Sequence, residues 1–233
     1  MKFETYVKEI IPRTKNVNSY RFFKPSNLDY LPGQFFFITL KSNGKKMKKH
    51  FSFSSSPTEQ NYIEFTKKLT ESEFSSILKK LVNDNWAKIE APFGKFTFIG
   101  EYKKIALLAG GIGITPFRSI CRYCTDKQLK NRITLIYGNR TEEDIVFREE
   151  FEDMQKLNKN LKCVFTINEG NDNWKGVTGF INAKMIKKEI YDYKNTIFFL
   201  CGPPGMVEGL KGILDQLGIA ADHIRAEYFI GYI

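Results

Sequence analysis

The segment LLAGGIGITP, residues 107–116, constrains the fold of this chain more than any other. An apolar run precedes Gly110, Gly111 and Gly113, which is typical of a buried strand that turns into a helix. Glycines there let a dinucleotide pyrophosphate approach the backbone, and the helix N-terminus supplies unpaired N–H groups and a positive dipole end. The same glycines also suit a tight turn without a ligand. The spacing differs from GxGxxG because Pro116 replaces the third glycine.

The residues after position 100 alternate between two patterns. Apolar runs at 105–109, 133–137, 163–167 and 197–201 are separated by helix-like stretches at 114–124, 147–157, 183–190 and 205–217. Continuous apolar runs are typical of parallel strands covered on both faces. The repeated order of strand and helix therefore predicts a doubly wound α/β parallel sheet over residues 101–233.

The first hundred residues have a different pattern. Short alternating segments at 3–10, 34–40 and 62–69 are separated by proline and glycine, which predicts strands and turns. One stretch, 74–82, has helical spacing of its apolar residues. We predict an antiparallel β-barrel with one helix over residues 1–100 and a domain boundary near 100–103. A chain of 233 residues can bury a core in each of two such domains.

The net charge of +10 favours an acidic partner through long-range steering. The lysines are scattered and no helix-turn-helix, zinc-finger or RNA-recognition signature accompanies them, so we do not expect nucleic-acid binding. The N-terminus alternates charged and apolar residues, unlike a secretory signal, and no later run reaches membrane-spanning length. We expect a cytoplasmic protein without membrane insertion.

The four cysteines are few and irregularly placed, which favours a reducing compartment over a disulfide framework. Cys121 and Cys124 form a CxxC inside a predicted helix, with no second pair to complete a metal site. We therefore expect them to pack in the core, and we expect no metal. Cys201 opens CGPPGM at the end of a predicted parallel strand, where open α/β sheets present ligand-binding groups. Its thiol faces a nicotinamide ring or is a small buried side chain.

The run KKHFSFSSSP, residues 48–57, combines a cation, an aromatic ring and several hydroxyls. This combination suits a flavin's phosphates, ring and N5 atom, although a serine-rich strand edge has the same composition. The segment APFGKF, residues 91–96, is typical of a turn between strands, in which Gly94 permits a positive φ.

Together these motifs resemble the ferredoxin-NADP reductase superfamily over nearly the whole chain. The family's arginine-x-tyrosine-serine segment is similar to Lys49-His50-Phe51-Ser52. The resemblance implies that Lys49 meets the FAD pyrophosphate, Phe51 stacks on the isoalloxazine and Ser52 lies near N5. Lysine cannot form the bidentate phosphate fork of arginine, which favours a looser grip on the cofactor. FAD is the expected flavin, with FMN as the alternative.

The resemblance also implies the rest of the site. Further FAD-binding residues would be His50, Phe53, Ser54, Thr66, Lys68, Ser75 and Gly94. NADPH or NADH would contact Gly110, Gly111, Gly113, Thr115, Pro116, Asn139, Arg140, Cys201, Gly202, Pro203 and Met206. At the C-terminus an aromatic ring would shield the flavin, and the candidates are Tyr228, Phe229 and Tyr232, with Phe229 included among the cofactor-binding residues.

The choice between NADPH and NADH stays open at this stage. Arg140 or Arg148 could bind a 2′-phosphate, whereas Glu142, Glu143 and Asp144 could bind or repel near the same ribose.

The implied activity is hydride transfer between NAD(P)H and flavin N5, with single electrons exchanged with ferredoxin or flavodoxin. Ser52, Cys201 and Glu227 would be the catalytic residues, and positioning would supply most of the catalysis. A first alternative is a reductase component of a separate oxygenase, since the chain has no plant-type iron–sulfur motif of its own. A second is a regulatory subunit that binds flavin or nucleotide without turnover.

Overall fold

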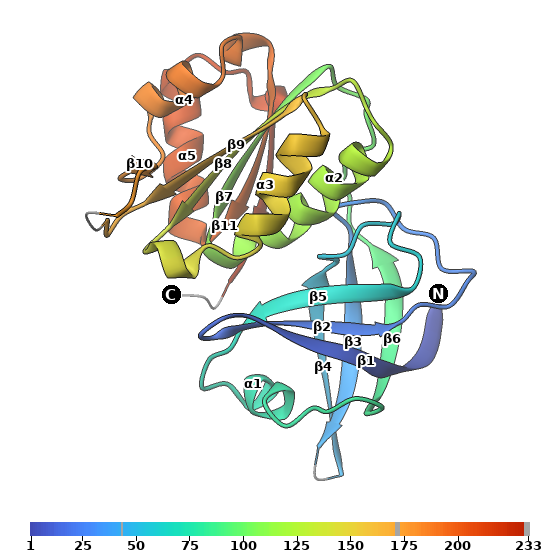
Figure 1. The fold of residues 1–233 in the computed structure, drawn as a ribbon. Helices are drawn as coiled ribbons and strands as arrows, with labels where there is room; N and C mark the ends of the chain where they lie inside the picture. The colour runs from blue at the N-terminus through green and yellow to red at the C-terminus, as the bar shows by residue number, and fades with distance from the viewer. Residues whose placement is uncertain (43, 171–172, 231–233) are drawn as a thin grey trace.

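The computed structural model describes residues 1–42, 44–170 and 173–230. Two six-stranded sheets stand one above the other in Figure 1. We call the part built on the first sheet the N-terminal domain and the part built on the second the C-terminal domain. Their architectures confirm the predicted antiparallel barrel and doubly wound parallel sheet.

The N-terminal sheet is antiparallel, in the order β4-β3-β6-β1-β2-β5. Its edge strands β4 and β5 lie close together. Phe51 of β4 stacks on Phe65 of β5 with 4.4 Å between ring centroids. The short helix α1 (Glu73–Leu78) lies at one end of this barrel. The strands are β1 (Lys2–Thr14), β2 (Val17–Phe23), β3 (Phe35–Ser42), β4 (Lys45–Ser52), β5 (Tyr62–Lys68) and β6 (Trp86–Phe93).

Strand β3 shows how the alternating sequence forms this barrel. Phe36, Ile38 and Leu40 are fully buried in its core, whereas Phe35 and Phe37 lie on the outer face and are only half-buried. Successive side chains of a strand point to opposite faces, so the period of two in the sequence separates a core face from an outer face.

The C-terminal sheet is parallel, in the order β10-β9-β8-β7-β11-β12. Helices cover both faces, α2 and α3 on one and α4 and α5 on the other (Figure 1). The strands are β7 (Lys104–Gly110), β8 (Arg132–Asn139), β9 (Leu161–Ile167), β10 (Val177–Thr178), β11 (Ile197–Gly202) and β12 (Ile224–Tyr228). The helices are α2 (Thr115–Asp126), α3 (Arg148–Leu157), α4 (Ala183–Glu189) and α5 (Pro204–Gln216).

The position of strand β7 in the sheet explains why its sequence is apolar throughout. Leu107 packs in the core beneath α2 and α3, and its neighbours Ala106 and Leu108 pack in the core beneath α4 and α5. Both faces of the strand are therefore buried, as expected for a central parallel strand.

Several elements differ from the sequence-based expectation, among them β10, β12 and α1. Strand β12 was not predicted, because its sequence IRAEY has no apolar run and its residues are only partly buried. It gains its strand conformation by pairing parallel to β11. Helix α1 ends at Leu78 rather than Val82, because Lys80 and Leu81 donate to carbonyls three residues back, as in a turn.

Arg118 of α2 joins the two domains. Its guanidinium is almost fully buried and donates to the carbonyl of Ser54 at 2.7 Å and to Glu59 at 2.8 Å. It also donates to Glu150 of its own domain at 2.8 Å. Phe147 lies under this network, with the guanidinium carbon of Arg118 5.3 Å from its ring centroid. Because buried ionic contacts require precise geometry, this network fixes the two domains against each other.

The segment after β6 also packs across the boundary. Phe98 is fully buried in the core beneath α2 and α3, and Phe96 packs against the same core. The expected boundary near 100–103 stays a prediction. No helix in the described part of the chain is long and apolar enough to cross a membrane.

Candidate functional site

A cleft of about 940 Å³ lies where the carboxyl end of the parallel sheet meets the N-terminal domain. The glycine turn after β7, the end of β8 and the start of α5 line its C-terminal side, and Lys68 of β5 lies on its other side. Open α/β sheets bind ligands at this edge. Its lining includes Asn16, Val17, Lys68, Gly110, Gly111, Ile112, Gly138, Asn139, Arg140, Asp144, Asn168, Pro203, Gly205 and Met206.

The glycine turn runs from β7 through a 3-10 turn (Gly111–Ile114) into α2. A Cβ on Gly113 would lie 2.3 Å from the carbonyl oxygen of Cys201, so this glycine is required by the close approach of β11. Gly111 has a φ of +50° and open space where its Cβ would lie. The turn therefore has two roles: Gly113 packs the sheet, and Gly110 and Gly111 present backbone to the cleft.

Thr115 and Pro116 form the first turn of α2, as the sequence predicts for a proline at a helix start. Both are buried, and neither is among the residues lining the cleft. Their contact with a nucleotide stays a prediction.

Asn139, at the end of β8, is the most informative polar group in the cleft. Its side chain is 6% exposed, and neither amide atom has a hydrogen-bond partner of good geometry among the described residues, although the hydroxyl of Tyr137 lies near enough to interact with it. A buried amide without partners costs free energy that a bound polar group can recover. This side chain therefore fits a nucleotide held along the glycine turn.

Of the two arginines considered for a 2′-phosphate, only Arg140 lines the cleft. Its side chain is largely exposed and lies 3.5 Å from the carboxylate of Asp144, which lines the same cleft. Arg148 forms ion pairs with Glu142 and Glu152 instead. The structure therefore removes Arg148 from the candidates.

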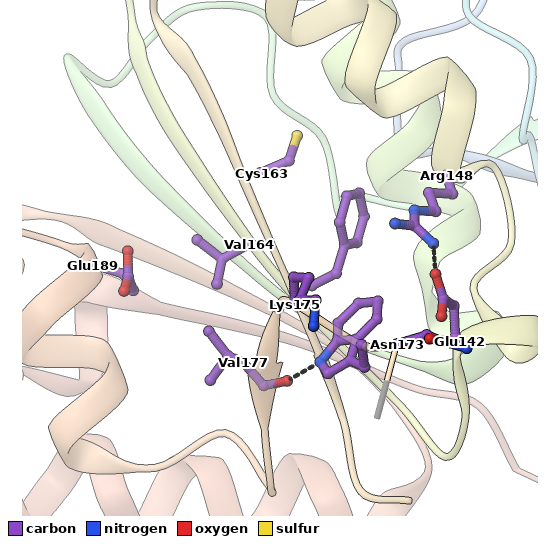
Figure 2. Close-up of a pocket in the computed structure, with 11 residues that line it drawn as sticks. Glu142, Arg148, Cys163, Val164, Asn173, Lys175, Val177 and Glu189 are labelled. Carbon is purple, nitrogen blue, oxygen red and sulfur yellow. Dashed lines mark hydrogen bonds and ion pairs between the residues drawn. The ribbon is translucent and has the colours of Figure 1, made fainter. Parts of the chain in front are cut away.

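Arg148 borders a second cavity of about 390 Å³ beside β9 (Figure 2). Figure 2 shows Arg148 turned toward Glu142, and the guanidinium carbon lies 5.5 Å from the ring centroid of Trp174. The indole N–H of Trp174 donates to the carbonyl of Val177 at 2.9 Å. These side chains satisfy one another, so this cavity has no feature that points to a cofactor.

Cys201 and Glu227 are direct register partners on the neighbouring strands β11 and β12. Cys201 is fully buried in the core, which raises the pKa of its thiol well above the ordinary value, with a further contribution from Glu227. Burial raises the pKa of Glu227 to about 7, and its Oε2 atom has no hydrogen-bond partner among the described residues. A carboxyl group in this state can hold or release a proton near neutral pH.

The segment after β12 lies close to the glycine-rich end of β11. The backbone N–H of Phe229 donates to the carbonyl of Gly202 at 2.9 Å, and its ring packs against the core beneath α2 and α3. Tyr228 bonds instead to Glu208 and Lys211 of α5. Tyr232 lies outside the described residues, so the ring that shields the flavin stays a prediction.

On the N-terminal domain, two lysines oppose each other across the gap between β4 and β5. Lys49 precedes Phe51 by two residues, and Lys67 follows Phe65 by two, so both lie on the side where the two phenylalanine rings stack. Burial, and then the nearby charge of Lys49, lower the pKa of Lys67 to about 8. Two lysines this close to each other suit an anion such as a pyrophosphate, and its binding here stays a prediction.

The sequence-based prediction includes Lys68 and not Lys67. The structure places Lys68 in the nucleotide cleft and Lys67 beside Lys49. The period of two in β5 was the available signal, because Phe65 and Lys67 share a face that Lys68 does not.

Three further predicted flavin-binding residues, Phe53, Ser54 and Thr66, have protein partners in the structure. Phe53 is fully buried and stacks on Tyr30 at 3.9 Å between centroids. The Ser54 hydroxyl donates to Glu64 at 2.8 Å and lies 2.9 Å from that of Thr66. These contacts satisfy the side chains without a ligand, and their assignment to the flavin stays a prediction.

Four more predicted residues lie around β4 and α1. Ser52 ends β4 and is 5% exposed, whereas His50 is exposed on the outer face of the sheet. The N–H of Ser75 donates to the hydroxyl of Ser72, which caps α1. Gly94 has a φ of +96°, and a Cβ there would lie 2.9 Å from the ring of Phe35. No group of three or more His, Cys, Asp or Glu side chains suited to a metal occurs among the described residues.

Comparison with known proteins gives two domain matches. The oxidoreductase FAD-binding domain matches residues 5–98, and the oxidoreductase NAD-binding domain matches residues 107–212. NADH-cytochrome b5 reductase 1 of Aspergillus terreus is 30% identical, over 93% of this chain and 78% of its own. The glycine betaine monooxygenase reductase subunit of Chromohalobacter salexigens is 26% identical, over 95% of this chain and 62% of its own.

Solved structures share the fold. The cytochrome b5 reductase domain of Ulva prolifera nitrate reductase has a TM-score of 0.86 and 23% identity, and 97% of each chain is covered. A ferredoxin NADP⁺ reductase from Neisseria gonorrhoeae with bound FAD and NADP has a TM-score of 0.84 and 19% identity, over 97% of this chain and 98% of its own.

Proposed function

The chain belongs to the ferredoxin-NADP reductase superfamily of flavoprotein oxidoreductases, and we propose that it transfers electrons from NADH through FAD to a separate one-electron acceptor protein. The observation that carries this proposal is the position of Cys201 and Glu227. They are paired on β11 and β12 at the carboxyl end of the parallel sheet, and Pro203, two residues after Cys201, lines the cleft.

The residues present fit both cofactors. The opposed Lys49 and Lys67 suit the pyrophosphate of FAD, and the unpartnered amide of Asn139 suits a nicotinamide dinucleotide in the cleft. When bound, FAD accepts a hydride equivalent from NADH and passes its electrons on singly.

Groups of the protein itself would orient the bound dinucleotide and hold a proton near the reacting atoms. Backbone at Gly110 and Gly111 orients the dinucleotide, and burial of Cys201 excludes water from the end of β11. Glu227 holds a proton at its carboxyl group near neutral pH, within the same strand pair. This group is the one to accept or return a proton when the redox state of the site changes.

We propose NADH rather than NADPH because of Asp144. Its carboxylate neutralises Arg140, the only one of the two candidate arginines that lines the cleft, and would repel a 2′-phosphate. The names of several relatives, NADH-cytochrome b5 reductases, support the same choice.

We propose an acidic electron-carrier protein as the acceptor, because the net charge of +10 steers such a partner toward the chain. A cytochrome b5 is the first candidate, since relatives named for it match most of this chain. A ferredoxin or another component of a separate oxygenase is the second, because other relatives are reductase components of a monooxygenase and a dioxygenase.

Anaerobic stopped-flow reduction tests this function. We expect purified protein to carry FAD, and NADH to bleach its absorbance near 450 nm, about where oxidised flavins absorb, at least tenfold faster than NADPH per mole. Asp144→Asn should reduce that preference, and Glu143→Asn, an exposed neighbour outside the cleft, is the control. Protein that retains no flavin, or flavin that neither nucleotide reduces, would contradict the proposal.

A further inference from the structure

The hydroxyl of Tyr137 lies behind the residues that line the cleft and joins two of them. Tyr137 is on β8, is fully buried and is not itself among the residues that line the cleft. Its hydroxyl donates to the carbonyl of Gly111 at 2.9 Å and accepts from the backbone N–H of Val146 at 3.4 Å. Gly111 and Val146 both line the cleft. One buried side chain therefore joins the glycine turn to the segment before α3.

Asn139 is a third cleft residue within reach of this hydroxyl. It follows Tyr137 by two residues on β8, so the two side chains project to the same side of the sheet. Burial raises the pKa of Tyr137, whereas the backbone of Val146 and the side chain of Asn139 lower it in part. Because burial has the largest effect, the hydroxyl keeps its proton at neutral pH and can donate it to Gly111.

Phe147, the residue after Val146, has a backbone conformation that its surroundings must hold in place. Its φ is +63°, in the left-handed region that residues other than glycine rarely adopt. The guanidinium carbon of Arg13 lies 4.7 Å from its ring centroid, and that of Arg118 lies 5.3 Å from it. These contacts fix Phe147 and, with it, the neighbouring N–H of Val146.

The two guanidinium groups beside Phe147 belong to different domains and share one carboxylate. Arg13 of β1 donates to Oε1 of Glu150 at 2.7 Å, and Arg118 of α2 donates to Oε2 at 2.8 Å. The chain just after Arg13 supplies Asn16 and Val17 to the cleft. The N-terminal domain therefore contacts Phe147 at the point where it also forms one side of the cleft.

A continuous set of contacts runs from the barrel to the glycine turn. Its members, in order, are Arg13, Phe147, Val146, Tyr137 and Gly111. A dinucleotide on the glycine turn is therefore placed relative to the barrel that carries the predicted flavin site. Hydride transfer requires the two reacting rings in near contact, and a misplacement of about 1 Å costs about 100-fold in rate.

We propose that Tyr137 is a positioning residue for hydride transfer: its hydroxyl sets the place of the glycine turn relative to the N-terminal domain, so that a nicotinamide ring bound there meets the flavin. Tyr137 acts through Gly111, Asn139 and Val146, because it does not line the cleft itself. The inference rests on the proposed function, since it requires hydride transfer between a dinucleotide in the cleft and a flavin on the barrel.

The test removes one hydroxyl and keeps the ring. Tyr137→Phe is compared with Tyr20→Phe, a matched control at another fully buried tyrosine. The hydroxyl of Tyr20 donates to the carbonyl of Leu78 in α1, at the end of the barrel away from the C-terminal domain (Figure 1). Anaerobic stopped-flow reduction of the FAD-containing proteins over a series of NADH concentrations gives the limiting rate and the half-saturating concentration separately. Urea unfolding and the flavin content report whether each variant is folded and loaded.

We expect Tyr137→Phe to lower the limiting rate of flavin reduction about tenfold or more, and to raise the half-saturating NADH concentration about threefold or less. Binding is spread over many contacts, whereas transfer depends on the placement of one ring. With NADH deuterated at the transferred position, the isotope effect in the variant should be at least as large as in the wild type, because transfer itself is slowed. Tyr20→Phe should match the wild type in all three measurements.

A second variant tests the connection to the barrel. Arg13→Lys keeps the positive charge but cannot make the forked contacts of arginine with Glu150 and Glu64. If Arg13 and Tyr137 act through one set of contacts, the double variant should lose less in limiting rate than the product of the two single losses. Single losses that multiply would overturn the connection between the barrel and the glycine turn.

Two further outcomes separate the possible failures. A Tyr137→Phe variant that loses only stability or only affinity for NADH, with the limiting rate of the wild type, would overturn the proposal and leave the hydroxyl as a structural group. Flavin in the wild type that NADH does not reduce would contradict the proposed function itself.

Discussion

Arg118 and Glu59 form an ion pair across the domain boundary, with 2.8 Å between Nη1 and Oε2. The side chain of Arg118 is 3% exposed and that of Glu59 is 12% exposed. A charge buried this deeply is costly unless its partners are in place. The pair therefore holds the two domains in one relative position, and the shape of the cleft between them depends on that position.

Replacing Arg118 should destabilise the protein strongly. Arg118→Met leaves the carbonyl of Ser54 without this donor and Glu59 without its charged partner, and removing one member of a buried pair costs about 3–5 kcal/mol. Urea unfolding measures the loss. Arg122→Met, which breaks the more exposed pair with Asp126 in the same helix, is the control and should cost less than about 0.5 kcal/mol. Similar losses in both variants would contradict the role of Arg118.

The same pair predicts the response to acid. Burial alone would raise the pKa of Glu59, but the hydrogen bonds and charge of Arg118 outweigh it and lower this pKa to about 2. A carboxylate with a lowered pKa contributes stability above its unfolded pKa, near 4.5, and loses it as the pH falls toward 2. We expect about 3 kcal/mol of unfolding free energy to disappear over this range. Glu59→Gln should show a shallower acid dependence in urea titrations, and an unchanged slope would count against it.

Much of the fold is predictable from sequence because both sheets have simple periods. The apolar run of β7 and the alternation of β3 each indicate burial directly, so both domain architectures follow from them. Strand β12 has no such signal: IRAEY becomes a strand only because β11 offers it an edge. The interdomain role of Arg118 is equally hidden, because no local pattern relates it to Glu59, which is distant in the chain.

The candidate site likewise has some residues that the sequence predicts and others that it does not. The glycine turn and Cys201 are visible as motifs; Gly110 and Gly111 line the cleft, whereas Cys201 is buried in the core beside Ala109 and its catalytic role stays a prediction. Lys67 was not predicted because Lys67 and Lys68 are adjacent, and they differ only in the face of the strand on which each side chain lies. Ser54 and Thr66 were chosen by their chemistry, which suits a ligand and the buried carboxylate of Glu64 equally well.

Substitutions of the two adjacent lysines, Lys67 and Lys68, should affect different cofactors. Lys67→Met removes a charge beside Lys49, so we expect FAD affinity to fall about 10- to 100-fold, or about 1.4–2.8 kcal/mol. Lys68→Met should leave FAD affinity unchanged and raise the KM for NADH, because Lys68 lines the nucleotide cleft. Fluorescence titration of the apoprotein with FAD measures the first effect. The reverse result would support the original choice of Lys68.

The pKa of Lys67 adds a pH dependence to FAD binding. Because burial and Lys49 lower this pKa to about 8, the side chain loses its charge as the pH rises through that value. We expect FAD affinity of the wild-type apoprotein to weaken above about pH 8, and that of Lys67→Met to be nearly flat over the same range. A parallel decline in both proteins would assign the effect to another group.

Glu227→Gln should change both stability and catalysis near neutral pH. Burial raises the pKa of Glu227 to about 7, so the folded protein holds a proton that the unfolded chain releases near pH 4.5. Wild-type stability should therefore fall as the pH rises from about 4.5 to 7, and the variant should lack this fall and be about 1–3 kcal/mol more stable at pH 8. Glu71→Gln, at a side chain 99% exposed, is the control and should follow the wild type.

The proton held by Glu227 should also affect the rate of flavin reduction. If Glu227 moves a proton beside Cys201, the rate of flavin reduction by NADH should depend on an ionisation near pH 7 in the wild type. The Glu227→Gln variant should lose that dependence while retaining FAD, whose expected phosphate contacts lie on β4 and β5 instead. Stopped-flow rates from pH 5.5 to 8.5, about one and a half units to each side of the expected ionisation, measure the effect. A variant that keeps the wild-type pH profile would leave Glu227 as a structural residue and assign the ionisation to a different group.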